Sequence, residues 1–191
     1  MPKPRLTKKQ RELVTDIRQM RRKHYLDPDE IASEPKSKTR TQALQNAKAK
    51  IISSYVILNY IVMEEQLNWV IRSHFFGKKR FGRQLLRNKH FNLFNHFLLE
   101  RLYLLQKLDF VKHLHNIPKW VATDLAALND LRNGLAHSLY LQYRRRQPEW
   151  KGQSIFTQDV FDRYCEDMKK LFEFFVVSFW PVARKGRGDK S

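Results

Sequence analysis

Two residues near the end of a predicted helix, Arg132 and His137, have side chains that together can cleave RNA, and Asn133 lies between them in the sequence. A histidine titrates near neutral pH, so His137 can take the proton of a ribose 2′-hydroxyl or protonate the leaving 5′-oxygen. The Arg132 guanidinium can neutralise the charge that builds on a phosphorane-like transition state. Because DNA lacks the 2′-hydroxyl, chemistry of this kind is specific for RNA.

The spacing of these residues restricts how they can act together. On a straight α-helix, five steps of about 100° place Arg132 and His137 roughly 140° apart. Asn133 and His137 are four residues apart and share a face. The long arginine side chain closes part of the gap. Either a local distortion at Gly134 closes the rest, or a second subunit completes the site, so the spacing predicts dimerisation.

The element that must position Arg132 is a helix predicted from about residue 119 to about 137, opened by Pro118 in its first turn. Arg132 lies on the apolar stripe of this helix, although arginine is rarely buried unless it is paired. Two interpretations remain open: an internal pair with Glu64, Glu65 or a helix end, or a phosphate bound in a cleft. One of the two glutamates could point inward and pair with a buried cation, or both could face solvent. The stripe consists of Val121, Leu125, Leu128, Leu135 and Leu139.

The charge balance indicates a polyanionic partner. Lys and Arg number 37 against 19 Asp and Glu, a formal net charge of +18, and aromatic residues make up 13% of the chain. Nucleic acid is the first expectation, with a merely basic, soluble surface as the alternative. Basic residues occur in a loop around Phe81 and in a triple arginine. They can bind phosphate, and Phe81 can stack on a base. The alternative is that both runs are only solvated surface. The predicted RNA-binding residues are Lys78, Lys79, Arg80, Arg83, Arg87, Arg144, Arg145 and Arg146.

The chain has only six glycines and seven prolines, the residues that most often interrupt helices, and this favours long helices. We predict an all-α fold, a compact bundle of four to five helices with a short irregular or β-hairpin-like insertion before the last helix. Residues 1–40 are a basic helical arm and linker, 41–183 the helical domain, and 184–191 a basic tail expected to be disordered. Helices are predicted over about 41–76, 91–108, 119–137 and 157–180, the last one capped by Thr157.

The remaining composition indicates a cytoplasmic protein without a membrane partner. The single cysteine, Cys165, excludes an internal disulfide and favours a reduced compartment. The beginning of the chain is charged and has no apolar segment typical of a signal peptide. The longest apolar run, residues 171–183, is too short to span a bilayer. The histidines lack an accompanying cluster of metal ligands, so neither metal nor cofactor is expected.

The stretch Leu-Asn-Asp-Leu-Arg-Asn-Gly-Leu-Ala-His, residues 128–137, resembles the signature of HEPN domains. That signature is an arginine, usually followed by a polar residue such as asparagine, then three to five further residues and a histidine. Arg132, Asn133 and His137 match it position by position. The order of predicted elements is also similar, with long helices before the motif and a short irregular segment and closing helix after it. The resemblance covers roughly residues 41–182 and excludes the arm.

The resemblance implies a bundle of four or five helices, commonly dimeric, with the motifs of two subunits facing one another. Many members of the family resemble metal-independent endoribonucleases of toxin–antitoxin or other defence systems. It implies that Arg132 and His137 are catalytic, that Asn133 supports them, and that RNA, a second copy and a separate antitoxin protein are partners. Other members are binding or regulatory modules. A non-catalytic nucleic-acid-binding module and a protein-interaction subunit therefore remain the alternatives.

Overall fold

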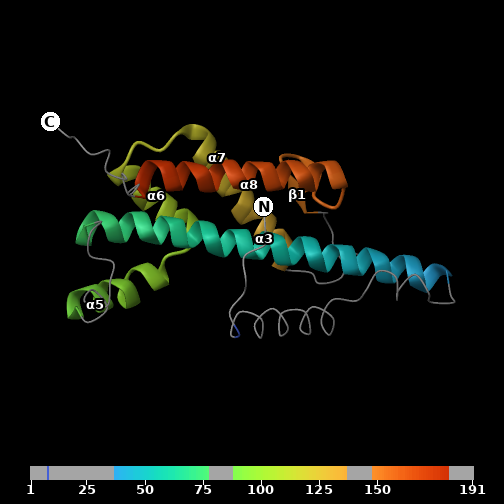
Figure 1. The fold of residues 1–191 in the computed structure, drawn as a ribbon, viewed down its shortest axis with the longest axis horizontal. Coiled ribbons are helices and arrows are strands. Elements are labelled where there is room, and N and C mark those ends of the chain that lie inside the picture. The colour runs from blue at the N-terminus through green and yellow to red at the C-terminus, as the bar shows by residue number, and fades with distance from the viewer. Residues whose placement is uncertain (1–7, 9–36, 78–87, 137–147, 181–191) are drawn as a thin grey trace. The chain divides into compact units, whose positions relative to one another are not determined.

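The computed structural model describes residue 8 and residues 37–77, 88–136 and 148–180. The described part is mostly helical, with five α-helices and one two-stranded hairpin before the last of them (Figure 1), which confirms the predicted fold class. The chain divides into two units, residues 1–51 and 52–191, so the boundary falls within the first long helix. The elements are α3 (Ser37–Phe76), α5 (Lys89–Phe97), the 3₁₀ turn η2 (Leu99–Arg101), α6 (Leu104–Leu114), α7 (Lys119–Ala136), β1 (Glu149–Trp150), β2 (Gln153–Ser154) and α8 (Gln158–Phe179).

Several predicted segments lie outside the described residues: the basic helix over residues 1–26 apart from residue 8, most of the loop around Phe81, the triple arginine and the tail. The predicted linker is described only at its end. There, α3 begins at Ser37, four residues before its predicted start at Thr41. Within the described residues, no helix is both long and apolar enough to cross a bilayer.

The single helix predicted over residues 91–108 is wrong, because the structure has two helices there, separated by η2. Asn88 caps α5, its side chain accepting hydrogen bonds from the His90 and Phe91 backbone N–H groups. A new helix starts after Tyr103, which is extended and whose N–H donates to the Gln106 side chain at 2.9 Å. The apolar spacing of the leucines continues through the break, so periodicity alone gave no sign of it.

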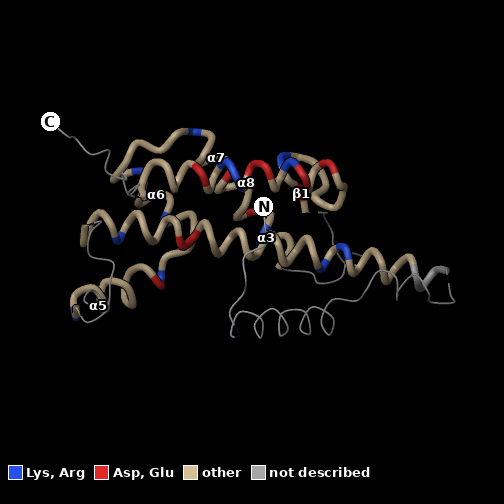
Figure 2. The backbone as a smooth tube through the Cα atoms, viewed as in Figure 1, with Lys and Arg blue, Asp and Glu red and all other residues tan. Residues whose placement is uncertain are grey.

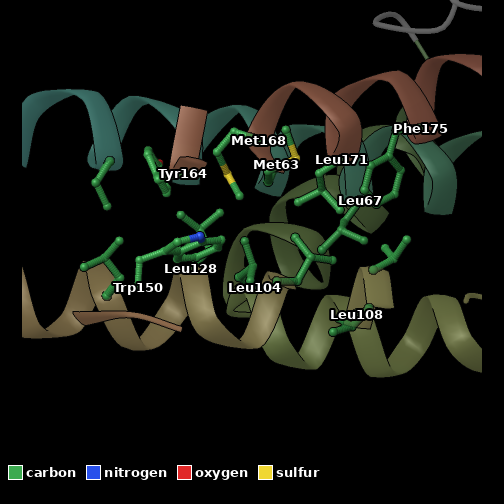
Figure 3. Packing of buried hydrophobic residues seen from close by; sticks show 14 of the residues in the cluster. Met63, Leu67, Leu104, Leu108, Leu128, Trp150, Tyr164, Met168, Leu171 and Phe175 are labelled. Carbon is green, nitrogen blue, oxygen red and sulfur yellow. The ribbon is translucent and has the colours of Figure 1, made fainter. Parts of the chain in front are cut away.

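The core of the second unit lies between α3, α6, α7 and α8, and its central side chains come from all four helices and from β1 (Figure 3). Apolar residues recur at three- and four-residue spacing on each helix, which places them on one face. Fully or almost fully buried members labelled in Figure 3 are Met63, Leu67, Leu104, Leu108, Leu128, Trp150, Tyr164, Met168, Leu171 and Phe175.

The helices α3 and α8 lie side by side and run in the same direction. The Asn59 amide donates to the Tyr164 hydroxyl at 3.0 Å, and the Trp180 indole N–H donates to Gln66 Oε1 at 3.0 Å. Because the position on α8 rises with the position on α3, the two helices are parallel. Burial raises the pKa of Tyr164 strongly, so its hydroxyl is protonated and is fixed by Asn59.

The helix α8 starts where the sequence predicted, directly after Thr157, and ends at Phe179, one residue before the expected end. Thr157 is the N-cap residue of α8, as predicted, but its side chain makes no capping hydrogen bond. The Thr157 hydroxyl donates to the backbone carbonyl of Ser154 at 3.1 Å, back into the hairpin, and not to the first turn of α8. Thr157 therefore links β2 to the helix.

The hairpin predicted before the last helix is present at residues 149–154. Glu149 pairs with Ser154 and Trp150 with Gln153 in an antiparallel register. Lys151 and Gly152 form the turn with φ values of 49° and 80°, the left-handed region that two-residue hairpin turns require. A residue other than glycine adopts this backbone region uncommonly, because it costs conformational free energy. We therefore expect contacts of the Lys151 side chain to offset that cost.

The Lys151 ammonium provides this offset by bridging two helices. Its Nζ lies 2.9 Å from Asp124 Oδ1 of α7 and 2.9 Å from Asp167 Oδ2 of α8. The Trp150 indole N–H also donates to Asp167 Oδ2, at 3.0 Å. We call these four residues, Asp124, Trp150, Lys151 and Asp167, the hairpin clamp, because they join the hairpin to both helices.

The hairpin clamp should make stability depend on acid pH. Burial raises the pKa of Asp167, but hydrogen bonds from Lys151 and Trp150 and the nearby positive charges outweigh burial and lower it. A lowered folded-state pKa stabilises the fold above the usual carboxyl pKa of about 3.9, and this stabilisation is lost as the pH falls through the folded value. Urea unfolding between pH 7 and pH 3 should show this loss, and Lys151→Met should reduce it. Equal acid dependence of the two proteins would contradict the assignment.

Candidate functional site

Arg132 lies on α7, one turn before the last residue of that helix. The buried face of α7 consists of Val121, Asp124, Leu125, Leu128, Leu131 and Leu135. The predicted core-facing position of Arg132 is therefore wrong by one residue. Leu131, only 1% exposed, fills that position, and Arg132 is half-buried at the edge of the buried face.

Within the described part of the chain, two contacts hold the Arg132 side chain. Its guanidinium carbon lies 5.2 Å from the centroid of the Tyr60 ring on α3, a cation–π contact. Its Nη1 donates to the Asn133 side-chain oxygen at 3.1 Å. A guanidinium has five N–H donors, and Asn133 takes one of them. The contacts therefore orient the cation by its face and one edge, an arrangement suited to presenting the remaining edge to a phosphate.

Tyr60 is a polar member of this site that the sequence did not reveal. Burial raises the pKa of its phenol, as does the charge of Glu64, against the opposing effects of a hydrogen bond with the Leu104 backbone and the charge of Arg132. The phenol is therefore neutral at physiological pH and its ring is an uncharged platform for Arg132. An aromatic residue among the apolar residues of α3 is typical of a core position, which is why the pattern gave no signal for it.

Glu64 and Glu65 pair with cations other than Arg132. Lys107 of α6, only 3% exposed, places its Nζ 2.6 Å from Glu64 Oε1. Glu65 accepts from Arg72 at 2.6 Å and from Asn68 at 2.9 Å. The inward-pointing carboxylate is thus Glu64, and the buried cation beside it is Lys107. Sequence reasoning overlooked Lys107, because a lysine within a leucine-rich helix usually lies on the solvent side.

The described part of α7 has no distortion at Gly134. The helix continues through Gly134 to Ala136. No bend at Gly134 therefore reduces the angle around the helix between Arg132 and the positions that follow Gly134. A Cβ atom added at Gly134 would lie 3.7 Å from the Pro148 Cβ, an ordinary van der Waals distance. Gly134 is therefore required neither by a special backbone angle nor by a close approach.

Gly134→Ala should consequently stabilise the protein. Alanine is favoured over glycine within a helix by about 0.8–1.0 kcal/mol, and a position near the helix end realises part of that. Chemical denaturation should show a free energy of unfolding raised by about 0.5 kcal/mol, with Gly152→Ala as the contrasting variant, because Gly152 has a φ of 80°. A destabilised Gly134→Ala protein would show that the helix does depend on this glycine.

Among the predicted site residues, the structure describes Arg132, Asn133, Glu64 and Glu65. It brings together Arg132 and Asn133, as expected, and adds Tyr60 and the Glu64–Lys107 pair one turn along α3. The predicted catalytic and RNA-binding residues outside the described part are His137, Lys78, Lys79, Arg80, Arg83, Arg87, Arg144, Arg145 and Arg146.

The described side chains can bind an anion and can stabilise developing negative charge. The charges of Glu64 and Lys107 neutralise one another. Arg132 stacks on the neutral ring of Tyr60, and the Glu64 carboxylate does not pair with it. A guanidinium in a partly desolvated setting binds phosphate oxygens more strongly than one in open water. The position of this charge is therefore suited to a phosphodiester.

Comparisons of the chain with protein-family models, with curated proteins and with solved structures gave no match.

Proposed function

We propose that the protein is a metal-independent endoribonuclease of HEPN type. The 2′-oxygen of a ribose forms a bond to the adjacent phosphorus as the bond to the 5′-oxygen breaks. The products are a 2′,3′-cyclic phosphate and a 5′-hydroxyl. The observation that supports this proposal is the half-buried Arg132, held by Tyr60 and Asn133 and paired with neither Glu64 nor Glu65.

Each residue of the motif has one task in this reaction. His137 removes the 2′-hydroxyl proton or supplies a proton to the 5′-oxygen. Arg132 donates to the phosphate oxygens, on which negative charge increases in the transition state. Asn133 fixes the guanidinium edge through its side-chain oxygen.

The proposed site is shared between two copies of the chain. About 140° separates positions 132 and 137 on a regular helix, and α7 is regular through Ala136. A second copy would supply the missing partner group across a two-fold axis. In this proposal, RNA reaches the site along the basic residues near Phe81 and at positions 144–146, favoured by the net charge of +18. Further parts of the proposal are a cytoplasmic role as a toxin or defence effector and control by a separate antitoxin protein.

The decisive experiment is cleavage of diverse RNAs by the purified full chain in EDTA. We expect cleavage with 2′,3′-cyclic phosphate ends, slowed at least 100-fold by His137→Ala, within the range typical of general acid–base catalysis. His113→Ala is the matched control, because His113 is exposed and its ring contacts the backbone carbonyl of Asp109 in its own helix. Intact RNA in EDTA, together with a growth defect on expression that His137→Ala does not relieve, would contradict the proposal.

One observation favours a second candidate, a non-catalytic RNA-binding module. The contacts of Arg132 with Tyr60 and Asn133 are both internal, as they would be if the motif served packing. In that case RNA binding should weaken steeply with salt and should survive His137→Ala unchanged. Binding and cleavage measured on the same variant therefore separate the two candidates.

A further inference from the structure

The Tyr60 ring that carries Arg132 has a carboxylate one helical turn away. Glu64 and Glu65 are the only carboxylates of α3, the helix of Tyr60, and they are the red stretch of α3 in Figure 2. Glu64 follows Tyr60 by four residues, so both lie on one side of the helix, about 6 Å apart along its axis. Burial raises the pKa of the Tyr60 phenol, the charge of Glu64 raises it further, and the charge of Arg132 lowers it. An anion and a cation therefore both lie near this ring.

The Glu64 carboxylate pairs with Lys107 of α6. The Lys107 Nζ lies 2.6 Å from Glu64 Oε1, and the lysine side chain is 3% exposed against 28% for the glutamate. A lysine with so little exposure is uncommon, and removing its charge from water costs free energy. Replacing a buried ion pair by apolar residues is often neutral or stabilising, so stability alone does not account for this lysine. Its effect on the neighbouring arginine does.

Without a cation of its own, the Glu64 carboxylate would attract the Arg132 guanidinium. Pairs of guanidinium and carboxylate with two parallel hydrogen bonds are among the strong hydrogen-bonded pairs of proteins, and salt screens a partly buried pair little. Arg132 is half-buried, and its Asn133 contact uses only one of its five N–H donors. A carboxylate and a phosphate bind the same planar fork of donors, so a guanidinium held by Glu64 is lost to RNA.

We propose that Lys107 is a positioning residue of the Arg132 site, which holds the Glu64 carboxylate and thereby keeps the Arg132 guanidinium available to a phosphate. Lys107 itself does not contact RNA in this arrangement, because it acts through Glu64. The phosphate in this inference rests on the proposed function. The capture of Arg132 by an unpaired Glu64 does not, since it is a property of the chain alone.

The first test is the crystal structure of the Lys107→Met variant at neutral pH. We expect an Arg132 guanidinium nitrogen within about 4 Å of a Glu64 carboxylate oxygen, the distance of an ion pair. The guanidinium should correspondingly leave the face of the Tyr60 ring, on which it lies at 5.2 Å in the wild type. An arginine that keeps its contacts with Tyr60 and Asn133, beside a hydrated Glu64, overturns the proposal.

The second test is single-turnover RNA cleavage, measured well below the unfolding temperature of each variant. Lys107→Met should slow cleavage about tenfold or more, because only the fraction of molecules with a free guanidinium is competent. The double variant Glu64→Leu with Lys107→Met should restore the rate, although it still lacks the lysine. A wild-type rate in Lys107→Met, or a slow rate that removal of Glu64 does not restore, overturns the proposal. A lysine that served stability alone would change the unfolding temperature and none of these rates.

Arg72→Met is the matched control. Its Nη1 lies 2.6 Å from Glu65 Oε1, so this variant also removes the cation of a glutamate on α3. Glu65 is about 100° around the helix from Glu64, away from the side of Tyr60, and its side chain is 57% exposed. Freed from Arg72, it should be hydrated and leave the cleavage rate unchanged. Equal losses in Arg72→Met and Lys107→Met would show that any lost cation slows cleavage, which overturns the proposal.

Failure of this inference and failure of the proposed function give different results. If the wild type does not cleave RNA, the proposed function fails, and the distance between Arg132 and Glu64 in the Lys107→Met crystal still decides the inference. If the wild type and Lys107→Met cleave RNA at the same rate, the inference fails and the proposed function stands.

Discussion

Glu64→Leu is expected to lower the free energy of unfolding by about 3–5 kcal/mol, because it leaves the Lys107 ammonium buried without its counter-charge. Lys107 is 3% exposed and its Nζ lies 2.6 Å from Glu64 Oε1, so hydration cannot replace the carboxylate without local opening. Urea denaturation at pH 7 measures the loss. It should be among the largest effects of any single substitution outside the apolar core.

Removing the other partner of the pair, by Lys107→Met, should lower the free energy of unfolding less. This asymmetry tests the explanation. Lys107→Met leaves a carboxylate that is 28% exposed and can be hydrated. The double variant Glu64→Leu with Lys107→Met should recover most of the stability, because replacing a buried ion pair by apolar groups is often neutral or favourable. If the double variant is as unstable as Glu64→Leu alone, packing and not the unpaired charge causes the loss.

Arg132→Ala is expected to slow RNA cleavage by about 100- to 1000-fold, the loss typical of removing one group that stabilises transition-state charge. The effect should appear in kcat more than in KM if Arg132 acts on charge that develops during the reaction. Arg132→Lys should recover little, because an ammonium lacks the planar fork that binds two oxygens and the broad face that packs on Tyr60. Single-turnover cleavage of a labelled RNA gives both constants.

Arg101→Ala is the control for this loss. Arg101 also lies over an aromatic ring, that of Phe97 at 5.6 Å, but is exposed in η2 away from the motif. Its removal should leave cleavage unchanged. Equal rates for wild type and Arg132→Ala would show that Arg132 has only a packing role, whereas parallel losses in both variants would indicate a general requirement for positive charge.

Much of the fold follows from local signals in the sequence. Pro118 and Thr157 mark helix starts, and Pro181 follows the end of α8. The break between α5 and α6 did not follow, because apolar residues keep helical spacing through it. Its cause is local hydrogen bonding around Tyr103, and periodicity carries no information about that.

The candidate site was less accessible to sequence reasoning. One helical step of about 100° decides whether Leu131 or Arg132 faces the core, and both choices continue the stripe. Pairings across helices are harder still, because Lys107 and Glu64 are 43 positions apart and a single sequence does not link them. Arg132 and Asn133 could be identified because a sequence motif contains both, whereas Tyr60 could be identified only from its contact with Arg132.

The parallel packing of α3 against α8 also affects the order in which the chain can fold during synthesis. The hydrogen bonds joining these helices link residues 105 and 114 positions apart, Asn59 with Tyr164 and Gln66 with Trp180. At a translation rate of about 5–20 residues per second, α8 follows α3 from the ribosome by about 5–20 s. For that interval the apolar face of α3 has no α8 to cover it, and nascent chains of this protein are then most exposed to chaperones and to aggregation.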